Sequence, residues 1–151
     1  MSTRSITRIW LPGKMPLATI YRQMDGYPTG MGADLKKILA NYKIGNGMKK
    51  IPNYANGIDE LGAKLIQKLK AENPYGNIYL QSPTAPISSD IEWIYDVEQM
   101  GEPIVPTPAT IKGFDWNKTI GVKLTVTDAG ANKVKFSGDI KKFDPKKAEE
   151  A

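Results

Sequence analysis

The densest group of residues that could do chemistry lies at positions 21–32, which read Tyr-Arg-Gln-Met-Asp-Gly-Tyr-Pro-Thr-Gly-Met-Gly. Its glycines would let the backbone approach a ligand closely, and the helix expected after it would present unpaired N–H groups that attract anions. The segment therefore predicts an anion-binding loop with Arg22 as a forked cation and Tyr27 as a stacking surface. The alternative is a tight turn in which Arg22 pairs with Asp25. The predicted ligand-binding residues of this loop are Arg22, Asp25, Tyr27, Gly30 and Gly32.

A weaker copy of this pattern precedes the second expected helix, since residues 27–31 and 54–58 both read Tyr-x-x-Gly-apolar. The chain between the helices is long enough to run back along the first one, which would bring both helix N-termini to one end of the domain. Tyr54 and Gly57 are therefore predicted to join the site, with Arg4 as a further cation. The alternative is coincidence, because Tyr, Gly and Asn are ordinary residues at helix entries. Neither the Walker A ending nor the full G-x-G-x-x-G spacing is present.

The absence of histidine and cysteine narrows the possible chemistry. It removes the commonest general base, the commonest zinc ligand and every Ser-His or Cys-His nucleophile. Carboxylate chemistry remains open, and one strand carries an acidic face at Asp90, Glu92, Asp96 and Glu98. Neighbours on that face lie ~7 Å apart, too far to share one ion unaided. We therefore expect no metal site, no cofactor and no catalysis, and we expect these carboxylates to face Lys123, Lys133, Lys135 and Lys141 of the following strands.

Composition indicates one ordinary folded domain. The chain has 151 residues, of which 40% are hydrophobic and 25% charged, and no apolar run approaches the ~20 residues that span a bilayer. Its start shows no apolar signal segment, so we expect a protein of the host cytoplasm or of a virion, without membrane contact. The net charge of +5 is uneven, because residues 1–75 hold 12 Lys/Arg against five Asp/Glu. This basic half could meet an anionic partner, or it could be an ordinary solvated lysine surface.

The elements that would position these residues follow from hydrophobic periodicity. We expect a hairpin at 5–24, helices at 33–43 and 58–72, an irregular excursion at 101–118, and strands at 77–81, 90–98, 120–127 and 133–143. The sequence thus predicts an α+β fold, with a single mainly antiparallel β-sheet of about six strands, two helices packed on one face, and the order ββααββββ. The domain should span 1–143, followed by a charged C-terminal tail, 144–151, that would fray alone. The three tryptophans are expected in the core or at its edge.

The opening Met1-Ser2-Thr3-Arg4-Ser5, the Asp25-Gly26-Tyr27-Pro28 run and Asn53-Tyr54-Ala55-Asn56-Gly57 together resemble a family of small uncharacterised proteins encoded in phage and bacterial genomes. The resemblance covers roughly the first 70 residues, and the Asp-Gly-Tyr-Pro run is its specific part. Family members often carry His-Trp where this chain has Gln23-Met24, so a role that needs the imidazole would be lost here. The resemblance implies a genomic context and no mechanism.

Three functions remain open on these grounds. The first is a phage-type, non-catalytic accessory protein that binds an anionic ligand, either a nucleotide-like molecule or nucleic acid, at the loop of residues 21–32. The second is a structural or interaction component of a larger assembly such as a virion, with protein partners. The third is a metal-dependent phosphoesterase that uses carboxylates alone.

Overall fold

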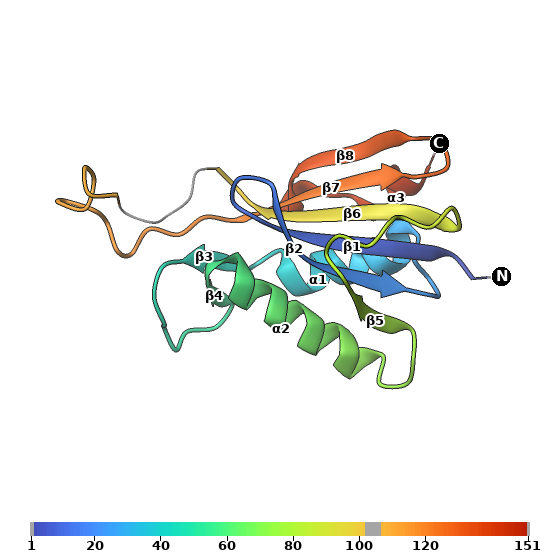
Figure 1. Cartoon of the computed structure of the whole chain (residues 1–151), viewed down its shortest axis with the longest axis horizontal. Helices are drawn as coiled ribbons and strands as arrows, with labels where there is room; N and C mark the ends of the chain where they lie inside the picture. The colour runs from blue at the N-terminus through green and yellow to red at the C-terminus, as the bar shows by residue number, and fades with distance from the viewer. Residues whose placement is uncertain (1, 102–106, 151) are drawn as a thin grey trace.

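A six-stranded sheet organises the molecule, with its strands in the spatial order β5-β2-β1-β6-β7-β8 (Figure 1). The computed structural model describes residues 2–101 and 107–150. Neighbouring strands of the sheet run antiparallel except β1 and β6, which run parallel. The strands are β1 (Arg4–Leu11), β2 (Met15–Arg22), β5 (Ile78–Gln81), β6 (Ile91–Gln99), β7 (Val122–Asp128) and β8 (Lys133–Asp139).

The helices lie between and after these strands. One turn of π-helix, η1 (Pro28–Gly32), leads directly into α1 (Ala33–Leu39), and α2 (Gly57–Glu72) follows later. A small parallel sheet of β3 (Lys43–Gly45) and β4 (Tyr54–Asn56) links the two helices. The chain closes with a 3₁₀ turn, η2 (Ile140–Lys142), and α3 (Pro145–Glu149). The predicted α+β fold with a mainly antiparallel sheet is therefore confirmed. The predicted order ββααββββ is incomplete, because β3 and β4 form a second sheet between the two helices and α3 follows the last strand.

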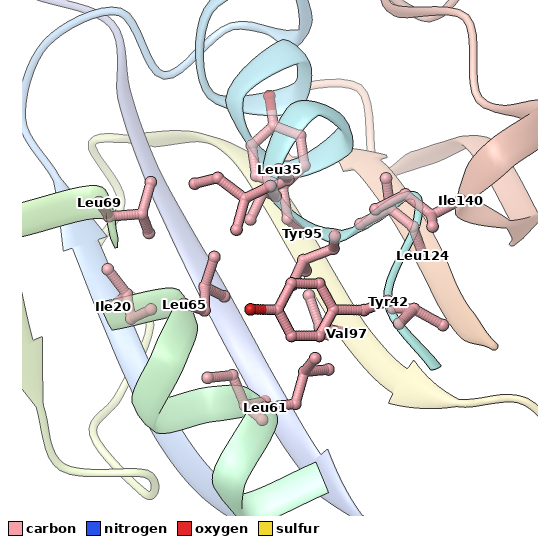
Figure 2. Close-up of a cluster of buried hydrophobic side chains, with 14 of the residues drawn as sticks. Ile20, Leu35, Tyr42, Leu61, Leu65, Leu69, Tyr95, Val97, Leu124 and Ile140 are labelled. Atoms are coloured by element: carbon pink, nitrogen blue, oxygen red, sulfur yellow. The ribbon is translucent and has the colours of Figure 1, made fainter. Parts of the chain in front are cut away.

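The core lies between the helices and one face of the sheet, as Figure 2 shows for Leu35, Leu61, Leu65 and Leu69. These side chains project from the apolar stripes of α1 and α2 and pack on strand residues such as Tyr95. Each fully buried leucine contributes about 1.5–3 kcal/mol of transfer free energy. The stripe of the first helix continues through Tyr42, which is buried although α1 ends at Leu39.

The parallel pair β1–β6 departs from a sheet built only of sequential hairpins. The chain between the two strands contains β2, α1, β3, β4, α2 and β5, so the pair joins segments far apart in sequence. A bulge lies where the register passes from Arg4 opposite Ile91 to Ser5 opposite Trp93. It turns Ile91 away from the face of Trp93 and into a second small cluster with Ile94.

The sheet face opposite the helices, here called the open face, carries ion pairs between β6 and the first hairpin. Asp96 accepts two hydrogen bonds from Arg8 and one from Trp10 Nε1, at 2.7–3.0 Å. Asp90 pairs with Arg4 at 3.5 Å, and Glu98 with Lys14 at 2.6 Å; Glu92 accepts a hydrogen bond from the Arg4 N–H. Lys123 stands opposite Glu98 in the β6–β7 register, as predicted. Among the described residues, however, Lys123, Lys133, Lys135 and Lys141 form no ion pair with these carboxylates, because cations of the first hairpin lie beside β6 and take them.

The charged segment 144–151 was expected to fray, and in the structure Pro145–Glu149 forms α3 instead. The Asp144 side chain caps this helix by accepting hydrogen bonds from the N–H groups of Lys146 and Lys147. Proline follows the cap at the first helical position, which its fixed φ suits. Ala148 is buried against the core, so local capping and one small apolar contact hold a segment that its charge alone would leave free.

Candidate functional site

The loop of residues 25–32 folds as a tight turn closed by its own backbone. The Met31 N–H donates to the Asp25 carbonyl and the Gly30 N–H to the Tyr27 carbonyl, each at 2.9 Å. A Cβ on Gly30 would lie 2.2 Å from the Asp25 carbonyl oxygen, so this position admits only glycine without rearrangement. The Tyr27 hydroxyl donates to the Asp25 carboxylate at 3.1 Å, and that hydrogen bond and charge raise the pKa of Tyr27. Gly32 completes the turn against the Phe143 ring.

Arg22 is buried, and its ion-pair partner is Asp34 rather than Asp25. Its guanidinium donates to the Asp34 carboxylate at 2.7 Å and, through Nε, to the Met24 carbonyl at 2.7 Å. The Arg22 side chain is 7% exposed and that of Asp34 28%. Asp34 stands in the first turn of α1, so the pair ties β2 to the helix that follows it. The prediction that Arg22 pairs with Asp25 is therefore wrong, because the start of α1 brings the Asp34 carboxylate to the Arg22 guanidinium.

Arg4 lies on the opposite side of the sheet from Arg22. Ser5 stands directly opposite Arg22 in the β1–β2 register, so Arg4, the next residue along β1, points to the open face. There it meets Asp90 and the carboxylate of Glu92. The two arginines predicted to share one anion are therefore separated by the sheet.

Tyr54 and Gly57 lie at the far end of the first helix from the loop of residues 25–32. The β3–β4 pairing joins the end of α1 to the start of α2, so the two helices run in opposite directions (Figure 1). The Tyr54 hydroxyl donates to the Gly47 carbonyl at 2.7 Å, and burial raises its pKa. Gly57 takes a positive φ of 80° at the entry to α2. The prediction that both helix N-termini lie at one end of the domain is wrong.

An anion does occupy the start of the first helix, and it belongs to the chain itself. The Glu149 carboxylate of α3 accepts hydrogen bonds from the Thr29 hydroxyl at 2.8 Å and the Thr29 N–H at 3.3 Å. Free N–H groups and the helix dipole favour a carboxylate there. The sequence signal for this contact was present, because the loop predicted an anion site and the C-terminal segment supplied carboxylates.

Comparison of the chain with protein-family models, curated proteins and solved structures found no match. Within residues 2–101 and 107–150, no three His, Cys, Asp or Glu side chains gather closely enough to hold a metal ion. In the same residues no helix is both long and apolar enough to cross a membrane.

Two further surface features were not predicted. The first is the segment of residues 107–119, here called the arm, which projects beyond the strand ends in orange in Figure 1. It carries Ile111 and Trp116, which are 53% and 51% exposed. The rings of Phe114 and Trp116 pack edge to face, with their centroids 5.0 Å apart. The expectation that all three tryptophans lie in or beside the core is wrong for Trp116. Residues 102–106 of the predicted excursion lie outside the described residues.

The second feature is an apolar groove of about 210 Å³ between α2 and the β2–β5 edge of the sheet, here called the α2 groove. Its lining includes Ile9, Leu17, Gly62, Ala63 and Leu80. Gly62 lets the helix approach, since a Cβ there would lie 3.3 Å from Ile9. A bulge in the β1–β2 pairing turns Leu17 to this side, which hydrophobic alternation alone could not predict.

Proposed function

We propose that this chain is a non-catalytic interaction component of a larger protein assembly, such as a virion, and that it binds its partner through the arm. The observation that carries the proposal is the half exposure of Ile111 and Trp116 on a segment that projects from the domain. Exposed aromatic anchors of this kind supply much of the binding energy at protein interfaces. The chain also lacks the histidine and cysteine on which most acid–base and nucleophilic catalysis depends.

Hydrogen bonds within the arm give it a defined local shape. Two turns are closed by hydrogen bonds to the Thr107 and Ile111 carbonyls, and the Asn117 N–H donates a hydrogen bond to the Asp115 carboxylate. The arm contacts the rest of the domain at Asn117, whose side-chain amide oxygen lies 3.5 Å from Lys49 Nζ. A preformed segment loses less conformational entropy on binding than a free one, which favours an anchor role.

Anion binding at the loop of residues 21–32 stays a prediction with less support. Arg22 is engaged by Asp34, Arg4 by Asp90, and the Thr29 N–H by Glu149. An external anion would have to displace Glu149 or break a buried pair. The predicted loop residues therefore serve the fold in the arrangement described.

Site-specific photocrosslinking tests the interaction proposal. A benzophenone amino acid replaces Trp116 in one variant and Tyr75 in a control, because Tyr75 is 94% exposed and remote from the arm in sequence. Both variants are produced in the native cells and irradiated. We expect an adduct of one discrete mass from position 116 and none from position 75. Equal adduct patterns, or no adduct at position 116, would refute the proposal.

A further inference from the structure

We propose that the partner of the arm is a second copy of this chain, and that the arm of one copy docks in the α2 groove of the next. This inference rests on the proposed interaction function and names its partner. It starts from two complementary surfaces of one molecule. The arm exposes Ile111 and Trp116, and the groove exposes an apolar recess lined by Ala63, Ile66 and Leu80.

Charge at the two surfaces is also complementary. Asp59 stands at the rim of the α2 groove, and among the described residues it forms no ion pair. The arm carries Lys112 two residues before Phe114 and Lys118 two residues after Trp116, and neither lysine has an ion-pair partner in the described part of the chain. A docked aromatic side chain would therefore bring Lys112 or Lys118 toward the Asp59 carboxylate. This attraction would orient the arm in the groove, and the arm lysines would disfavour docking on a basic surface.

The same chain cannot supply this contact in the arrangement described. The arm extends past the strand ends, whereas the α2 groove lies along the helix and the β5 edge (Figure 1). Arm and groove are different surfaces, so each docking event leaves one free arm and one free groove. Such a head-to-tail contact produces open chains or closed rings rather than a simple symmetric dimer.

The size of the contact sets its strength. An aromatic side chain buries about 150–250 Å² when fully enclosed, and a stable interface needs about 1,200–2,000 Å² in total. Insertion of Trp116 and its neighbours alone falls short of that range. The association should therefore be weak and strongly dependent on concentration.

Sedimentation of the purified full chain over a wide concentration range tests the inference, together with two variants. Trp116→Ala removes the anchor, and Ala63→Arg obstructs the groove at an exposed helix position with a like charge for the arm lysines. We expect the wild type to form oligomers, and each variant to associate at least about tenfold more weakly, as loss of an interface anchor does. Tyr75→Ala and Ala71→Arg serve as matched controls and should behave as wild type, because Tyr75 is remote from both surfaces in sequence and exposed Ala71 borders a different recess of α2 with Lys37 and Ile38.

Mixing the two variants gives the decisive measurement. The Trp116→Ala chain keeps its groove and the Ala63→Arg chain keeps its arm, so the mixture should form a 1:1 heterodimer and nothing larger. A mixture that stays monomeric, or oligomers that neither variant weakens, would overturn the inference. A monomeric wild type that still crosslinks from position 116 to a different protein would overturn this inference and leave the interaction function standing. A monomeric wild type without that crosslink would sink both.

Discussion

The buried pair of Arg22 and Asp34 gives the sharpest stability prediction. Asp34→Ala removes the carboxylate and leaves a guanidinium, on a side chain that is 7% exposed, with the Met24 carbonyl and the Met31 sulfur as its remaining partners among the described residues. Breaking a fully buried ion pair costs about 3–5 kcal/mol, because one charge stays buried without compensation. Asp34 is 28% exposed, so water can reach the vacated position and reduce the penalty. We therefore expect a loss of about 2–3 kcal/mol in the free energy of unfolding.

Chemical and thermal unfolding followed by circular dichroism would measure this loss. For a domain of this length it corresponds to a fall in melting temperature of about 5–10 °C. Asp59→Ala is the matched control, because Asp59 also stands in the first turn of a helix and has no ion pair among the described residues. It should cost only the helix-dipole contribution of about 0.3–1 kcal/mol.

A double-mutant cycle separates the ion pair from other effects of the substitution. Arg22→Met keeps most of the apolar stem and removes the charge, so adding it to Asp34→Ala should restore part of the lost stability. The coupling between the two positions should also be nearly independent of salt, as expected for a buried pair. If Asp34→Ala changes stability by less than about 0.5 kcal/mol, or if the two substitutions are additive, the structural role assigned to Arg22 is wrong.

Three further predictions follow from other contacts. Among the described residues the buried Thr7 hydroxyl has no hydrogen-bond partner, so Thr7→Val should raise the free energy of unfolding by about 0.5–2 kcal/mol in urea titrations. Burial raises the pKa of Tyr95, whose hydroxyl donates to the Gly26 carbonyl at 2.7 Å. Because Tyr95 then ionises at lower pH in the unfolded chain than in the folded one, its contribution to stability should be complete below pH ~10 and fall at higher pH. Tyr95→Phe should make the free energy of unfolding less dependent on pH in that range. Glu149→Ala frees the Thr29 N–H, so amide exchange in α3 should accelerate, and phosphate should raise the melting temperature of this variant more than that of wild type. A phosphate response that is the same in both proteins would count against anion binding at that helix start.

Much of the fold could be predicted because its local signals agree with its packing. The apolar stripe through Leu61, Leu65 and Leu69 placed α2 correctly, since the same residues that make the helix amphipathic fill the core. The strand alternation around Leu124 placed β7 for the same reason. The pairing of β1 with β6 was not predicted, because no local sequence pattern indicates which distant strand pairs with the free edge of β1.

The candidate site was harder to predict, because its residue types suit both ligands and internal partners. The sequence predicted that an anionic ligand binds at the loop before α1, but it could not show that the Glu149 carboxylate of the chain itself lies there. Arg22 was predicted to bind an anion, but the register of β1 and β2 places its side chain in the interior of the fold. The arm was read only as irregular chain, since glycine and proline mark a loop without stating where its aromatic side chains point.

The parallel pairing of β1 with β6 also governs the timing of folding during synthesis. Arg8 and Asp96 face each other across the pair although they lie 88 positions apart in the chain. At about 5–20 residues per second, a ribosome needs roughly 4–18 s to make the intervening segment. During that interval the first hairpin presents an unpaired strand edge to the solvent, the kind of surface that recruits chaperones or neighbouring nascent chains. The centre of the sheet is thus completed late, and a nascent chain truncated before β6 should be prone to aggregate.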